Sequence, residues 1–124
     1  MKNLTSTFTL ILSLVFVISC GKTDAPPPEP LDPSNLVSEL QTQFADADAE
    51  IKPMVDEVIK FYQDKNYIGA FQALDKVLFR SGLDEKSRIL ASRASLTISN
   101  LLDDQAAKGD EAAKRLKKNI MLYK

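Results

Sequence analysis

Apolar residues recur every three or four positions from Val37 to Phe61. This spacing places them on one side of an α-helix and forms a heptad seam, which also permits self-association. Pro53 lies inside the segment, where proline removes one backbone hydrogen bond and crowds the preceding turn. The unbroken register favours one kinked helix; the alternative is a break near Lys52, with Pro53 in the first turn of a new helix. The seam consists of Val37, Leu40, Phe44, Ala47, Ile51, Met54, Val58 and Phe61.

Further helical patterns follow the turn at Asn66. The first has an apolar face between Tyr67 and Leu78 and ends near Gly82, since glycine readily adopts the left-handed conformation that closes a helix. Asp84 is the predicted N-cap of the next helix, which runs to about Lys108, and the turn Gly109-Asp110 starts the last one. No segment alternates with period two over a useful length. The predicted fold is therefore all-α, a small antiparallel bundle of three to four helices.

Composition excludes several classes of function. The chain of 124 residues has 16 basic and 17 acidic side chains, so no strong field attracts nucleic acid. It has no histidine, the side chain that titrates nearest neutral pH, and Ser95 and Ser99 therefore have no histidine to activate them. We expect neither an enzyme nor a bound cofactor.

The acidic residues Asp46, Asp48 and Glu50 suggest a calcium site. A calcium loop needs a glycine after three ligands and a distal bidentate glutamate, whereas here alanines occupy the positions between the acidic residues. Helix geometry would also point residues two positions apart to different sides. We therefore expect no metal site.

After Met1-Lys2-Asn3, an uncharged apolar run extends from Leu4 to Ser19. The run has the character of an export signal and is shorter than the roughly 20 residues of a membrane span. At its end, Val17-Ile18-Ser19-Cys20 resembles the lipobox of bacterial lipoproteins. The resemblance implies that residues 1–19 are removed and that Cys20, the only cysteine, is acylated and anchors the chain in a membrane. An ordinary secretory signal is the alternative.

The anchor would be followed by a proline-rich tether. Residues 20–33 hold five of the six prolines and are predicted to be extended, whereas residues 34–124 form the helical domain, with Ser34 or Asn35 as its first N-cap. At about 3.1 Å per residue, the tether reaches roughly 40 Å. A proline motif for a groove-binding partner is the alternative. In lipoproteins, Gly21 after the acylated cysteine favours the outer over the inner membrane in a host that has both.

The segment Met54 to Gly82 resembles one tetratricopeptide-type helix pair. The matching residues are Met54, Val58, Phe61, Asn66, Tyr67, Ala70, Leu74 and Val77. The pattern departs from the repeat at Val58, where a small residue is usual, and at Gly82, where a proline is common. The resemblance implies a partner-binding face at Val55, Ile59, Tyr62 and Gln63. Either this face is an exposed apolar groove for a peptide or lipid, or residues 36–50 fold back and cover it.

These patterns predict a membrane-anchored module of the cell envelope that binds another envelope protein. The alternative is a binding protein for a small apolar or cell-wall ligand. On the last helix, Lys117 and Lys118 follow the acidic start Asp110-Glu111, an order that complements the helix dipole. A basic patch for phospholipid head groups is the alternative explanation for these lysines.

Overall fold

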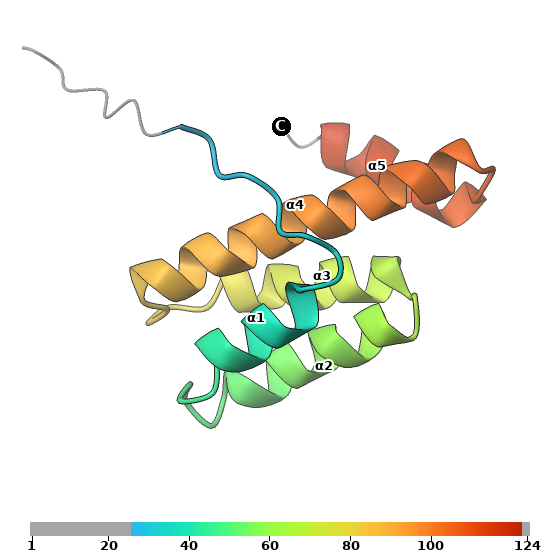
Figure 1. Cartoon of the computed structure of the whole chain (residues 1–124). Coiled ribbons are helices and arrows are strands. Elements are labelled where there is room, and N and C mark those ends of the chain that lie inside the picture. Colours follow the sequence, from blue (N-terminus) through green and yellow to red (C-terminus); the bar gives the residue numbers. More distant parts are fainter. Residues whose placement is uncertain (1–25, 123–124) are drawn as a thin grey trace, which may run out of the picture.

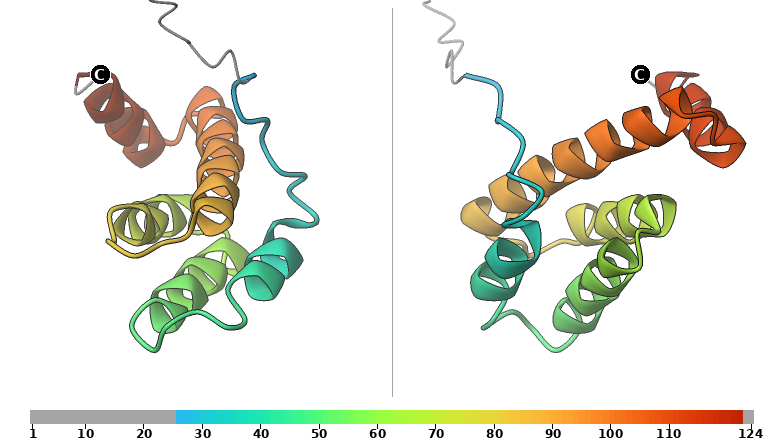
Figure 2. Two further views of the ribbon diagram at one scale, coloured as in Figure 1. Left: turned by 90° about the vertical axis from the view of Figure 1, so that its left-hand side faces the viewer. Right: turned by 45° about the vertical axis from the view of Figure 1, so that its right-hand side comes forward.

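The computed structural model describes residues 26–122, and this part of the chain contains five helices and no strand. The all-α fold is confirmed, with five helices in place of three to four. Figure 1 shows the long helix α4 above α3, with α2 at the lower edge, and Figure 2 shows the same order from two other sides. The helices are α1 (Leu36–Gln43), α2 (Lys52–Gln63), α3 (Tyr67–Leu78), α4 (Glu85–Ala107) and α5 (Glu111–Leu122).

The predicted continuation of one helix through Pro53 is wrong. The helix α1 ends at Gln43, and α2 begins at Lys52 with Pro53 in its first turn, where the missing N–H costs no helical hydrogen bond. Between them the chain turns, and the N–H groups of Ile51 and Lys52 both donate to the carbonyl of Asp48, at 2.9 and 3.0 Å. The apolar spacing nevertheless predicted burial correctly, because Phe44 and Ile51 in this loop are buried.

The helices α2 and α3 form a hairpin with a tight turn. Lys65 adopts a left-handed φ of 57°, and the side chain of Asn66 caps α3 by accepting a hydrogen bond from the N–H of Gly69, at 3.0 Å. Gly69 also faces the ring of Phe61, and a Cβ at this position would lie only 2.9 Å from that ring. The two helices thus approach closely at Gly69, next to the buried Ala70 that the sequence pattern indicated.

Predicted N-caps begin the last two helices. Asp84 accepts a hydrogen bond from the N–H of Ser87 at 2.9 Å, and its other carboxylate oxygen accepts one from the Ser87 hydroxyl at 2.7 Å. Asp110 accepts from the N–H of Ala113 at 3.0 Å. Gly82 has φ +90°, but it lies in the turn before Asp84 and does not close α3 as predicted, because α3 ends at Leu78 with Phe79 as its C-cap. These caps satisfy amide groups that have no partner inside the helix.

One core holds the bundle together. The helix α3 packs against α2 and α4, α1 contacts both α4 and α2, and α5 packs against α4. Within residues 26–122, no helix combines the length and the apolar character needed to cross a bilayer. The largest fully buried side chains of the core are Leu36, Leu40, Val58, Leu74, Val77, Ile98 and Leu102.

Truncating Ile98 tests this core. Ile98 is fully buried on α4, whereas Leu96 on the same helix is 39% exposed. We expect Ile98→Ala to lower the free energy of unfolding by about 2–5 kcal/mol, because the bundle cannot fully close the resulting cavity. Leu96→Ala should lower it by less than about 1 kcal/mol. Urea unfolding measures both, and equal losses would contradict this packing.

Acid should weaken the cap at Asp84. The hydrogen bonds from the backbone and side chain of Ser87 lower the pKa of the Asp84 carboxyl below its ordinary value of about 3.9. The stabilisation is therefore complete above about pH 4 and is lost as the pH falls through the lower pKa of the folded state. Asp84→Asn keeps an acceptor that does not titrate. We expect unfolding of this variant to depend less on pH than that of the wild type, and identical pH profiles would contradict the cap's role.

Candidate functional site

The predicted lipidation site, Cys20, lies outside the described residues. Its acylation and the removal of residues 1–19 stay predictions. The structure does describe the chain from Pro26 onward, and therefore shows how the segment after Cys20 meets the helical body.

The predicted partner-binding residues do not form an exposed apolar groove. Val55 and Ile59 on α2 are buried, and Leu40 and Phe44 at the end of α1 lie beside them. The alternative prediction is therefore correct, since part of the segment 36–50 folds back over this side of α2. This folding back was possible only because the helix does not continue through Pro53: α1 ends at Gln43 and α2 begins at Lys52.

A shallow hollow remains where α1 crosses α2. It has a volume of about 280 Å³, and its floor is formed by edges of the buried Leu40, Phe44, Val55 and Ile59. Its rim carries the exposed polar side chains Gln41, Lys52 and Asp56. Two of the four predicted residues, Val55 and Ile59, thus lie beneath this α1–α2 hollow. A partner would contact the polar side chains of the rim before it reached them.

The other two predicted residues lie beyond the hollow. Tyr62 is half-buried, and its hydroxyl donates a hydrogen bond to the carbonyl of Pro33 at 2.8 Å. Burial raises the pKa of the Tyr62 hydroxyl, with smaller contributions from Tyr67 and Asp32, so it remains a donor at neutral pH. Its ring lies 5.7 Å from that of Tyr67. Gln63 is exposed at the last position of α2.

The contact of Tyr62 with Pro33 belongs to a larger feature that the sequence patterns did not reveal. Residues 29–33, here named the strap, are bound to the helical body. Leu31 is only 3% exposed, and its carbonyl accepts a hydrogen bond from the Thr97 hydroxyl at 2.7 Å. The Nε of Arg93 donates to the carbonyl of Glu29 at 2.9 Å. Residues 29–33, predicted as part of the tether, therefore pack against the helical domain that was predicted to begin at residue 34.

The strap continues into α1 through Asp32. The Asp32 carboxylate accepts hydrogen bonds from the N–H and the hydroxyl of Ser34, at 2.8 and 2.6 Å, and these bonds lower its pKa. Its carbonyl accepts from the N–H groups of Asn35 and Leu36, at 3.0 and 3.1 Å. The side chain of Asn35, a predicted N-cap, makes no capping bond. Asp32 organises this helix start in its place.

One signal in the sequence pointed to the strap. Leu31 is the only large apolar residue between Ala25 and Leu36, and a solvated spacer has no need of it. Because proline lacks an N–H, the strap offers mainly carbonyls, and side chains of the body supply the donors. These donors are Tyr62, Arg93 and Thr97, and they come from α2 and α4.

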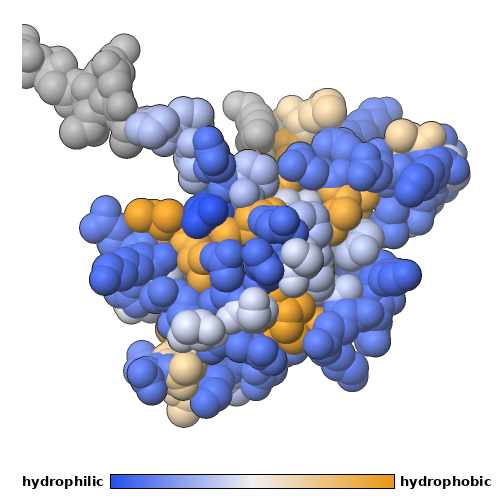
Figure 3. Space-filling view, viewed as in Figure 1, coloured by the Kyte–Doolittle hydropathy of each residue, from blue (hydrophilic) through white to orange (hydrophobic). Residues whose placement is uncertain are grey.

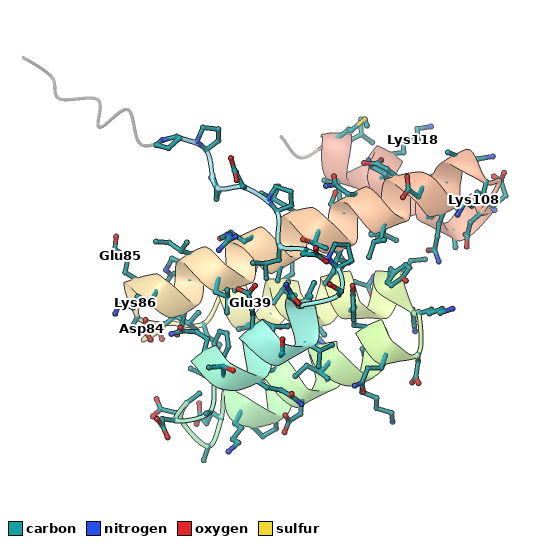
Figure 4. The ribbon with its side chains drawn as sticks, in the orientation of Figure 1. Glu39, Asp84, Glu85, Lys86, Lys108 and Lys118 are labelled. Atoms are coloured by element: carbon teal, nitrogen blue, oxygen red, sulfur yellow. The ribbon has the colours of Figure 1, made fainter. Side chains whose placement is uncertain are left out.

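A second hollow, of about 220 Å³, lies between the α1–α2 loop and the start of α4 and is lined by Asp46, Asp48 and Asp84. Figure 4 labels Asp84 there, close to Glu85 and Lys86. The loop is not helical, contrary to the geometry expected for Asp46 and Asp48. Among residues 26–122, no group of three or more acidic, histidine or cysteine side chains is arranged to hold a metal ion.

The surface outside these hollows is mainly hydrophilic. Figure 3 shows blue side chains over most of one face, with separate small orange patches between them. Such scattered apolar groups are normal on a protein surface. This face therefore presents no broad apolar area.

No protein-family model matches the chain, and searches of curated proteins and of solved structures also find no match. The α2–α3 hairpin has the helix-turn-helix form that the tetratricopeptide resemblance implies, but membership of that family stays a prediction. The lipobox resemblance likewise stays a prediction.

Loosening the strap should destabilise the body. We expect Leu31→Ala to lower the free energy of unfolding by about 2–4 kcal/mol, because it opens a buried cavity. Thr97→Val should cost about 1–3 kcal/mol, because it leaves the buried Leu31 carbonyl without its donor. Urea unfolding measures both changes. Pro28→Ala, at an exposed position just before the strap, is the control and should change stability by less than about 0.5 kcal/mol. Equal effects at Leu31 and Pro28 would contradict docking of the strap.

Proposed function

We propose that the protein is a membrane-anchored lipoprotein that serves as a protein-interaction module of the cell envelope. In this proposal Cys20 carries the lipid anchor, residues 21–28 form the spacer, and the helical body contacts another envelope protein. The resemblance to lipoproteins at Gly21 favours the outer membrane where the host has two membranes.

The docked strap is the observation that carries this proposal. A spacer that reached from Cys20 to residue 33 would let the body swing over a wide radius. Docking at Glu29 shortens the span to nine residue steps, at most about 30 Å when fully extended. It also makes the spacer leave the body at one place, beside α4. An anchored body held in this way presents the same faces to its neighbours. This suits a protein partner that lies at a fixed distance from the membrane.

The α1–α2 hollow is the proposed contact area. It lies on the side of α2 that the tetratricopeptide resemblance marks for partners, and its rim offers a cation and a carboxylate, Lys52 and Asp56. The alternative, a pocket for a small apolar or cell-wall ligand, has less support. The hollow of about 280 Å³ lies just below the roughly 300–1,000 Å³ typical of ligand pockets.

Site-specific photocrosslinking in cells tests both parts of the proposal. A photoreactive amino acid would replace Lys52 on the rim of the hollow. We expect one specific envelope protein to be captured and identified by mass spectrometry, and we expect Cys20→Ser to abolish both this adduct and membrane retention. Lys76, an exposed cation on α3, is the control position and should not capture the same protein.

The experiment distinguishes failure of the lipid anchor from failure of the contact area. If Cys20→Ser leaves the protein in the membrane fraction with unchanged lipid content, the lipid anchor is wrong. If the anchor holds but Lys52 and Lys76 capture the same proteins, the α1–α2 hollow is not the contact area.

A further inference from the structure

The outward face of α5 combines cations with exposed apolar side chains. The exposed cations Lys114, Arg115 and Lys118 lie on it, and it ends in Met121 and Leu122, which are 70% and 71% exposed. Their spacing of three, four and seven positions places them along one side of the helix. The opposite side of α5 holds the buried Ala113.

The charges of this face are largely available for an external partner. Lys114 pairs with Glu111 at 2.7 Å, and Lys117, beside the face, pairs with Asp103 of α4. Arg115 and Lys118 have no carboxylate partner within residues 26–122. Asp110 is occupied in capping the start of α5. Leu122 lies eleven positions after Glu111, about 16 Å along the helix, so the acidic start does not neutralise the far end.

The outward face of α5 lies near the point where the described chain enters the structure. In Figures 1 and 2 the described chain enters at the upper edge of the molecule, and α5 also rises to that edge at its C-terminal end. The labelled Lys118 stands at the same edge in Figure 4, and Figure 3 shows pale apolar surface there beside the grey C-terminal atoms. The helix α2 lies at the opposite, lower edge in every view.

A chain anchored at Cys20 cannot move this edge far from the bilayer. Cys20 precedes Pro26 by six residues, a reach of roughly 20 Å at most. The strap holds the exit point against α4, so the edge from which the chain emerges is the edge nearest the anchor. The end of α5 shares that edge.

We propose that the outward face of α5 binds the surface of the bilayer, with Arg115 and Lys118 on anionic phospholipid head groups and Met121 and Leu122 in the interfacial region. This inference rests on the proposed lipid anchor and deepens it. Helices that lie in the interface combine cations with leucine-like side chains, and long basic side chains keep their charge in the head-group layer while their stems contact apolar surface. The anchor concentrates α5 at the membrane, so a short helix suffices where it would bind only weakly alone.

Tryptophan fluorescence tests this orientation, because the natural chain contains no tryptophan. Full-length Leu122→Trp, purified from membranes, would be reconstituted into phosphatidylcholine–phosphatidylglycerol vesicles that carry a quencher on the lipid acyl chains. We expect its fluorescence to be quenched. Glu57→Trp, exposed on α2 at the opposite edge, is the matched control and should stay unquenched.

Charge removal tests the head-group contact. In the Leu122→Trp protein, the double change Arg115→Gln and Lys118→Gln should lower the membrane-bound population of α5 by about fivefold per cation. The double change Lys60→Gln and Lys76→Gln removes the same charge from exposed positions on α2 and α3 and should leave quenching unchanged. Pure phosphatidylcholine vesicles should give weaker quenching than the anionic mixture.

Three results would overturn the inference. If the protein floats with the vesicles but Leu122→Trp is quenched no more than Glu57→Trp, α5 does not face the bilayer, although the anchor stands. If both double changes reduce quenching equally, the attraction is general and not a property of this face. A protein that does not float with the vesicles would refute the lipid anchor, and the orientation of α5 would fall with it.

Discussion

The helix α2 is apolar on two sides, and the fold follows from the need to cover both. Its seam side carries Val58 and Phe61 and packs against α3, where Gly69 lets the ring of Phe61 approach closely. Its second side carries Val55 and Ile59, which a two-helix hairpin would leave in water. The helix α1 covers that second side, and it can reach it only because the chain turns between Phe44 and Ile51.

That turn also determines where the proline-rich segment lies. Once α1 is folded back against α2 and α4, the residues before it run along α4. Leu31 is buried there, and side chains of α2 and α4 supply donors to carbonyls that have no partner within the strap itself. A segment that would be a solvated spacer in isolation thus becomes part of the body. The direction in which the chain leaves the domain is consequently a property of the fold.

This arrangement gives the proposed anchor a structural role beyond retention. A fixed exit beside α4 divides the surface into an edge near the anchor, with the end of α5, and a far edge, with α2 and the α1–α2 hollow. The two proposals use these edges separately: lipid contact at the first and protein contact at the second. Each edge has chemistry suited to its partner, cations with exposed apolar side chains on α5 and a small mixed hollow beside α2.

Local patterns in the sequence determined which positions are buried and where α3, α4 and α5 begin. The three-to-four spacing placed Phe44, Ile51 and Val58 in the core, and Asn66, Asp84 and Asp110 begin helices by hydrogen bonds to amides three residues ahead. These effects act over one or two helical turns and are therefore visible in the order of residues. Only the tertiary structure decided that Pro53 starts a helix, that Val55 and Ile59 are covered, and that Leu31 is docked. Each of these outcomes depends on contacts between distant segments, such as Thr97 with Leu31, and a local pattern carries no record of which distant surface will be adjacent.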